Sequence, residues 1–307
     1  MIELLRSEWL RARSRRIVAV LAIGGACGIV VGVGIGASQS DPPPAAAVRR
    51  AQVQYRETLG VCLASSVGEG DLHGLSREEV CRRSVRPGDF LLSDSLTLDR
   101  FLGALEGTAS LLGIMTAVIG ASLVGADWSS GAMGTLLTWE SRPGRILAAR
   151  AAVIATVVIG LAIGLQVLFA LAWWLATVVR GTALGGEGWL GEVAETIARV
   201  SVMGAVLALI TAGLATIARS TAGGMIGLLV AIVLIDWFAR GLRPEVAAAG
   251  LIQNATVFVS EVPAFIYDNA GKQVAMVTAG GAATTLAIWV GLVLAVGAAV
   301  FGRRDVT

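Results

Sequence analysis

The stretch DWSSGAMGTLLTWESRPGRILAAR, residues 127–150, lies between two long apolar segments. Ser129 and Ser130 can accept hydrogen bonds from the free N–H groups at the start of a helix. Apolar residues then recur at helical spacing and give this helix an apolar side: Ala132, Met133, Leu136 and Leu137. Pro143 and Gly144 should end it, because proline disfavours the helical conformation of the residue before it. The pattern predicts a short cytoplasmic helix that contacts the membrane or a partner. The alternative is a simple interfacial connector.

The composition is typical of an integral membrane protein. Of 307 residues, 55% are hydrophobic and 15% are charged, whereas charged residues make up about a quarter of a soluble domain. The net charge of +2 gives no indication of nucleic-acid binding. Three cysteines and one histidine, His73, leave too little material for a metal site or a histidine-dependent active site. Nearly all basic residues are arginine, which is typical of a GC-rich coding sequence.

The apolar segments predict an all-α integral membrane protein with six transmembrane helices, each about 20 residues or longer. The predicted spans are 17–37, 101–125, 150–179, 196–218, 222–239 and 279–301. Residues 1–16 form an amphipathic interfacial helix, with Ile2, Leu5 and Trp9 on one face. The alternative is the n-region of a cleaved signal peptide. The apolar run that follows is longer than a usual signal peptide core, which favours a retained anchor.

The first span carries a glycine at every fourth position: Gly24, Gly28, Gly32 and Gly36. This bare face favours close packing of another helix, although the glycines could also reflect a glycine-rich composition. Cys27, in the same span, is expected to be a small buried residue.

Two polar segments separate the spans on the outer side. Residues 38–100 form an extracytoplasmic loop domain with a helical stretch at 45–63. We expect a disulfide between Cys62 and Cys81, since an oxidising compartment lets it persist; the alternative is two free thiols. Residues 241–278 are apolar in places and form a second external, partly re-entrant segment, which we expect to dip into the membrane as short helices.

The arginines of the short flanks and loops set the orientation. They place both termini in the cytoplasm of a multi-pass plasma membrane protein, which we expect to be bacterial, and they place the loop 126–149 in the cytoplasm. Glu106 and Asp236 lie in the spans near the outer interface, and Arg240 follows the fifth span directly. These three residues are candidates for a pathway. We interpret Asp236 and Arg240 as a structural pair, with a role in a pathway as the alternative.

The chain has no G-x-x-x-x-G-K-[ST] motif, because its single lysine, Lys272, lacks the required neighbours. We therefore expect no catalytic residue, bound metal or cofactor in this chain, and no hydrolysis of nucleotide by the chain itself.

The stretch 127–150 resembles the corresponding loop in the permease subunits of ABC-2 type (type V exporter fold) ABC transporters. The order of the predicted segments along the chain also resembles that family. The residues that carry the resemblance are Asp127, Gly131, Thr135, Leu136, Leu137, Arg142, Pro143, Gly144, Arg145 and Arg150. The chain departs from the family in having aspartate rather than the commoner glutamate at 127. The family pattern has a glycine together with a threonine, whereas Gly131 and Thr135 are separated here, which is a second departure. Gly134, directly before Thr135, restores the pair.

The resemblance implies that two separate ATPase subunits, which bind ATP and Mg, dock below a pore made of this chain and a second copy or homologue. The helix 129–140 would be the coupling helix of the loop 126–149, and residues 1–16 a connecting helix. The implied coupling residues are Asp127, Ser129, Gly131, Thr135, Leu136, Leu137, Glu140, Arg142 and Arg145. The substrate would be a hydrophobic or amphipathic lipid, drug or peptide that is exported, and membrane lipids would be further partners.

Three alternatives remain open. A membrane enzyme acting on lipids would need a cluster of His, Asp or Glu, which the sequence lacks. A stand-alone secondary transporter would need charges deep in the membrane or internal repeats. A membrane receptor or immunity protein would use residues 38–100 for sensing.

Overall fold

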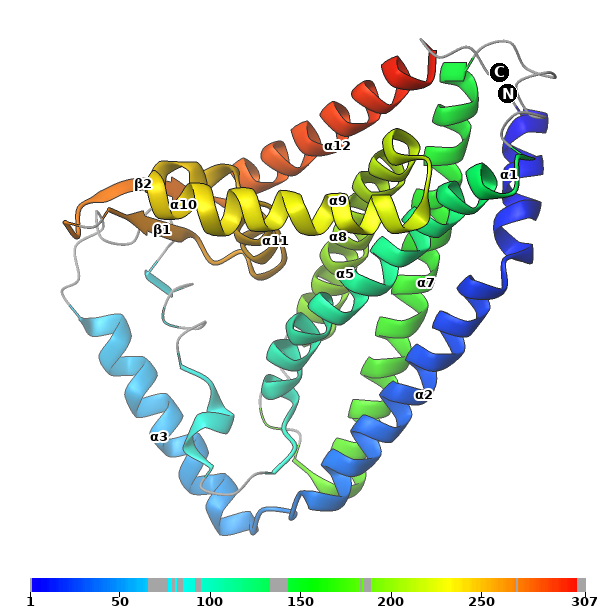
Figure 1. Ribbon diagram of the computed structural model, residues 1–307. Helices are drawn as coiled ribbons and strands as arrows, with labels where there is room; N and C mark the ends of the chain where they lie inside the picture. Colours follow the sequence, from blue (N-terminus) through cyan, green and yellow to red (C-terminus); the bar gives the residue numbers. More distant parts are fainter. Residues whose placement is uncertain are drawn as a thin grey trace. The chain divides into compact units, whose positions relative to one another are not determined.

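The computed structural model describes residues 2–65, 77–78, 81, 85–91, 95–132, 143–182, 184, 189–268 and 270–302, which are almost entirely helical (Figure 1). The longer helices are α1 (Ile2–Ser14), α2 (Arg16–Gln39), α3 (Ala45–Ala64), α5 (Leu98–Ser129), α7 (Pro143–Arg180), α8 (Trp189–Ala218), α9 (Thr221–Ile232), α11 (Leu251–Ser260) and α12 (Ala279–Gly302). The shorter elements are η2 (Pro87–Phe90), the π-helical η3 (Val233–Ala239), α10 (Arg240–Leu242), η4 (Pro244–Ala249), β1 (Ala264–Tyr267) and β2 (Gln273–Val277).

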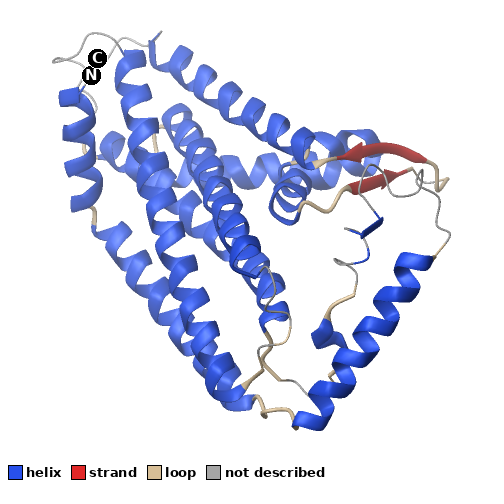
Figure 2. Cartoon of the chain, turned by 180° about the vertical axis from the view of Figure 1, so that it is seen from behind, coloured by secondary structure: helices blue, strands red, loops and turns tan. Residues whose placement is uncertain are grey.

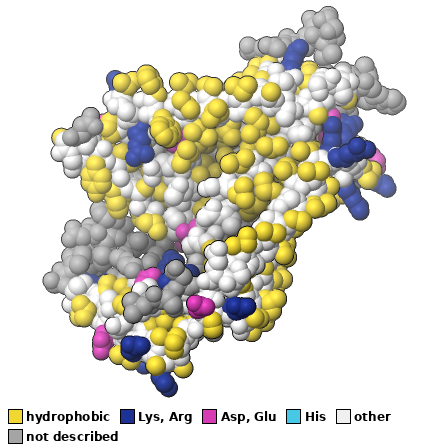
Figure 3. All heavy atoms as spheres, turned by 60° about the horizontal axis from the view of Figure 1, so that its bottom comes forward, with side chains coloured by type: hydrophobic (Ala, Val, Ile, Leu, Met, Phe, Trp, Pro, Cys, Tyr) yellow, Lys and Arg dark blue, Asp and Glu magenta, His cyan; other side chains and the backbone are white. Residues whose placement is uncertain are grey.

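Within these described residues, six helices are long and apolar enough to cross a membrane. They are Arg16–Gln39, Leu98–Ser129, Gly144–Arg180, Trp189–Ala218, Thr221–Leu242 and Ala279–Val300. The two shortest have 22 residues each, which exceeds the roughly 20 residues that a hydrocarbon core requires. The described chain is predominantly helical, and its six apolar helices are consistent with the predicted all-α membrane protein apart from one short β-hairpin. Apolar side chains also dominate the face of the chain shown in Figure 3.

The chain divides into two compact units. The first consists of Met1–Gly24, Glu106–Leu165 and Thr196–Thr307, and the second of Gly25–Leu105 and Gln166–Glu195. Long helices such as α5 and α7 contribute one part to each unit.

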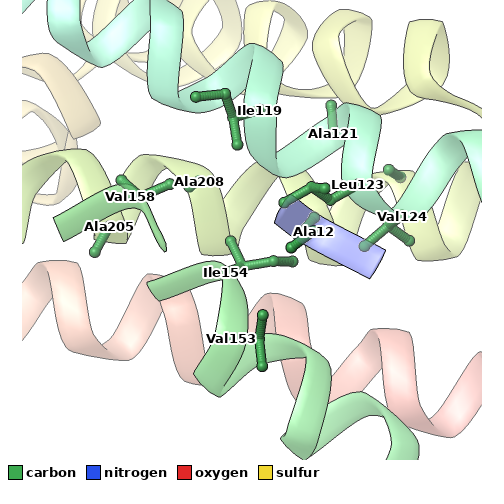
Figure 4. Packing of buried hydrophobic residues seen from close by; sticks show 12 residues of the cluster. Ala12, Ile119, Ala121, Leu123, Val124, Val153, Ile154, Val158, Ala205 and Ala208 are labelled. Carbon is green, nitrogen blue, oxygen red and sulfur yellow. The ribbon is translucent and has the colours of Figure 1, made fainter. Parts of the chain in front are cut away.

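The core of the first unit forms where α5, α7 and α8 pack against one another (Figure 4). Gly120 of α5 makes this packing close, because a Cβ at that position would overlap the backbone carbonyl of Ala208 in α8. Thr211 of α8 also donates a hydrogen bond from Oγ1 to the carbonyl of Ala117, at 2.9 Å. Small residues and interhelical hydrogen bonds of this kind are the usual means of holding helices together in membranes.

The segment 241–278 differs from the prediction of short membrane-dipping helices alone. It does contain short helices, but it also contains a two-stranded antiparallel sheet in which Ala264 pairs with Val277 (Figure 2). Ile266 and Val277 of this hairpin are buried against Val257 of α11. The runs PAFI and VAMV are as short as a strand, and periodicity alone does not distinguish short apolar helices from strands.

Helix α3 confirms the predicted helical stretch in the second unit, and Cys62 and Cys81 form the predicted disulfide with their Cα atoms 5.8 Å apart. In this unit α5, α7 and the start of α8 meet around Phe101, whose ring centroid lies 5.2 Å from that of Phe169 and 5.5 Å from that of Trp189. Aromatic pairs at these separations stabilise a core beyond their burial of area.

Helix α2 differs from the expectation in one respect. Cys27, predicted to be buried, is exposed, because only 6% of the apolar window of α2 is buried by the described chain. An apolar helix surface of this kind is compatible with contact to lipid rather than to protein.

Candidate functional site

Five charged residues of the first unit gather where α1 meets α5 and α7. We call them the charged cluster: Glu8, Arg11 and Arg15 from α1 and its C-terminal end, Asp127 from α5 and Arg150 from α7. Nη2 of Arg150 lies 2.8 Å from Oδ2 of Asp127, and Nε of Arg150 lies 3.2 Å from Oε2 of Glu8. Arg11 lies 3.3 Å from Glu8 and 3.7 Å from Asp127, and Arg15 pairs with Asp127 as well.

The central members of the charged cluster are almost completely buried. The exposed fraction is 6% for Glu8, 1% for Asp127 and 3% for Arg150. Charges taken out of water cost several kcal/mol each unless they are paired. Each of the three has a partner of opposite charge, while the side chains of Arg11 and Arg15 remain partly exposed at the edge of the cluster.

The inner face of α1 positions two of these groups. Glu8, Ala12 and Arg15 lie on the same side of the helix, because they are four and three residues apart. Ala12 is only 4% exposed and packs among apolar residues of α5 and α7 (Figure 4). Its small side chain lets α1 come close enough for Glu8 to reach Arg150.

The charged cluster connects both ends of one loop. Asp127 lies in the last turn of α5, which ends at Ser129, and Arg150 lies in the second turn of α7, which begins at Pro143. Glu8 pairs with Arg150 and with Arg11, and both of these arginines also pair with Asp127. Helix α1 is thereby joined to both helices that carry the predicted cytoplasmic loop.

A third segment reaches the same end of α5. The guanidinium carbon of Arg219, in the turn between α8 and α9, lies 4.9 Å from the ring centroid of Trp128. This distance fits a cation–π contact. In addition, a Cβ at Gly125 would overlap the backbone of Thr221. The base of the loop is therefore held by α1, by α7 and by the α8–α9 turn.

The structure corrects the predicted helix start at Ser129. Helix α5 continues through Ser129, and the hydroxyls of Ser129 and Ser130 donate to the carbonyls of Ala126 and Asp127 instead of accepting from N–H groups. Gly131 follows with φ +72°, the left-handed conformation that commonly ends a helix. Pro143 begins α7, and proline is favoured at this first position. The predicted end of the short helix before it lies outside the described residues.

Several predicted coupling residues cannot be placed. Thr135, Leu136, Leu137, Glu140 and Arg142 lie outside the described residues. Arg145 is half-buried in the first turn of α7.

The four glycines of α2 have open space beside them. No atom of the described chain lies within 4 Å of a Cβ at Gly24, Gly28, Gly32 or Gly36. The predicted packing partner of this face is therefore not found within the described part of the chain.

Asp236 has a structural role near the C-terminal end of the fifth apolar helix. Its carboxylate accepts hydrogen bonds from the N–H groups of Leu251, at 3.0 Å, and Ile252, at 3.2 Å. It thus caps the start of α11, whereas among the described residues it forms no salt bridge with Arg240. Glu106 is half-buried on α5.

The sequence indicated Asp127 but not its partners. Glu8 is one of only two acidic residues in α1, and its spacing from Arg11 and Arg15 was the signal that could have identified it. No group of three or more potential metal ligands occurs among the residues that the structure describes. The chain matches no model of a known protein family and no curated protein.

Proposed function

We propose that this chain is the membrane permease subunit of an ATP-driven exporter of the ABC-2 type. Separate ATPase subunits supply the energy, and a second copy of the chain or a homologue completes the pore. The substrate is hydrophobic or amphipathic. The proposal places both termini and the loop that joins α5 to α7 in the cytoplasm of a bacterial plasma membrane.

One observation carries the proposal. The charged cluster joins α1 to the two helices that flank the loop, at Asp127 and at Arg150. A force applied to the loop is therefore transmitted to three helices together instead of being absorbed by one flexible connection. Conformational coupling requires contiguous packed and bonded elements of this kind, and a permease driven from the cytoplasm has to move its spans through such a loop.

The burial of Asp127 refines its role in this proposal. A side chain that is 1% exposed cannot at the same time contact a soluble ATPase. Asp127 holds the base of the loop, and residues farther along the loop make the contact with the ATPase.

The variant L136D/L137D tests the coupling role. Charges on the apolar side of the loop should abolish stable binding of the ATPase and its coupling to transport while the six spans remain folded. The control is V53D, which places one such charge on a residue of α3 that is already 54% exposed. ATPase binding is measured by copurification, and folding by size-exclusion chromatography. Unchanged ATPase binding and unchanged transport in L136D/L137D would overturn the coupling role.

A further inference from the structure

Helix α1 packs against the protein with one side, and its outer face, the side that points away from the protein, is exposed. The charged cluster and the packing of Leu5 and Ala12 turn one side of the helix toward the protein. With 3.6 residues per turn, Arg6, Leu10 and Arg13 lie away from this side, and Trp9 lies at the edge between the two sides, one turn after Leu5. Trp9 is 42% exposed and Leu10 is 59% exposed.

The arginines of this outer face differ from those of the charged cluster. Arg11 and Arg15 pair with buried carboxylates, whereas Arg6 and Arg13 are exposed and form no salt bridge within the described residues. Arg16, the first residue of α2, is also exposed. Glu3 is the one exposed acid of α1, so positive charge exceeds negative charge on the exposed part of this segment. Arginine side chains gather at this end of the chain in Figure 3.

The position of α1 along the chain places this face at the edge of the membrane. Only Arg15 separates α1 from α2, and α2 is apolar enough to span the bilayer. The C-terminal end of α1 therefore lies at the level of the headgroups. Tryptophan prefers this level, and leucine on the same side can insert between lipid chains.

We infer that Arg6, Trp9, Leu10 and Arg13 form a docking face for anionic phospholipid headgroups. The guanidinium group matches a phosphate through two parallel hydrogen bonds. Each basic residue near the surface also strengthens binding to an anionic leaflet by about fivefold relative to a neutral leaflet. The apolar pair and the adjoining span favour lipid over a soluble acidic protein. This inference depends on the membrane location of α2 and not on the proposed ATPase.

The test uses the full chain in phosphatidylcholine vesicles that contain a small fraction of a lipid brominated near the headgroup. Bromine quenches the fluorescence of a nearby tryptophan, and the difference between the wild type and W9F isolates the signal of Trp9. Brominated phosphatidylglycerol should quench Trp9 several-fold more than brominated phosphatidylcholine at the same mole fraction. In R6Q/R13Q the ratio of quenching by brominated phosphatidylglycerol to quenching by brominated phosphatidylcholine should fall close to one.

The control is R49Q/R50Q, which removes two exposed arginines from α3 and should keep the preference. Equal quenching by both lipids in the wild type would overturn the inference, as would a preference that survives in R6Q/R13Q. Absence of quenching by either lipid would also overturn it, because the face would then be covered by protein rather than lipid.

Discussion

Arg150 and Asp127 form a buried ion pair, 2.8 Å between Nη2 and Oδ2, that joins the start of α7 to the end of α5. The pair lies at the base of the loop, and Glu8 extends it to α1 at 3.2 Å from Arg150. This arrangement makes α1 and the adjoining ends of α5 and α7 into one connected element of the first unit.

Replacing Asp127 with asparagine should destabilise the protein strongly. The substitution would leave three arginines facing one another with Glu8 as their only acid in the charged cluster, and removal of one partner from a buried ion pair costs about 3–5 kcal/mol. Thermal unfolding of the purified protein in detergent measures the effect. D41N is the control, since Asp41 is exposed. Equal melting temperatures for D127N and D41N would contradict the role of the cluster.

Replacing Glu8 with glutamine should loosen α1 while the spans remain folded. A hydrogen bond to a charged group contributes about 1.5–3 kcal/mol, so amide exchange in α1 should become roughly tenfold faster or more. Hydrogen–deuterium exchange of the peptide that covers residues 2–14 is the measurement. E3Q, at an exposed position of the same helix, should leave the exchange rate unchanged. An α1 that exchanges equally slowly in E8Q would show that packing of Ala12 and Leu5 alone holds it.

Two glycines of α5 should respond in opposite ways to alanine. G120A places a methyl group against the carbonyl of Ala208, and overpacking of this kind costs about 1–3 kcal/mol. G107A meets no atom within 4 Å and should be neutral or stabilising by up to about 1 kcal/mol, because alanine favours the helix. Thermal unfolding of both variants side by side checks the prediction, and the same shift in both would argue against close contact of α5 and α8.

Loss of the disulfide should destabilise the second unit. A crosslink between residues separated by 19 positions contributes about 3 kcal/mol, chiefly by restricting the unfolded chain. The variant C62A/C81A should therefore be cleaved faster by protease within residues 38–100 than the wild type. C27A serves as the control, because Cys27 is a free cysteine. Equal cleavage rates for wild type and C62A/C81A would contradict the stabilising role.

Local signals explain which parts of the fold could be predicted from the sequence. The six apolar helices follow from length and hydropathy, and α3 and the disulfide follow from composition and from the expected external position of the cysteines. The hairpin of β1 and β2 was missed because its apolar runs are too short for their periodicity to separate strand from helix.

The charged cluster could be predicted only in part, because it depends on tertiary contact. Asp127 was identified by its place in the loop, but the sequence pattern placed its carboxylate at a partner surface. Asp127 is instead buried by Arg150 and Arg15, and this burial arises from packing of α1 that no local sequence pattern encodes. Ser129 likewise suits either end of a helix, and the positive φ of Gly131 decides that a helix ends there.

The central claim, that a separate ATPase drives this chain, is tested most directly by copurification. The tagged protein is extracted from its native membrane in mild detergent that retains bound lipid, and the bound chains are identified by mass spectrometry. We predict a soluble ATPase with Walker motifs in stoichiometric amount, lost in L136D/L137D and retained in V53D. Purification of the wild-type chain without any ATPase under these conditions would contradict the claim and favour a stand-alone transporter or a receptor.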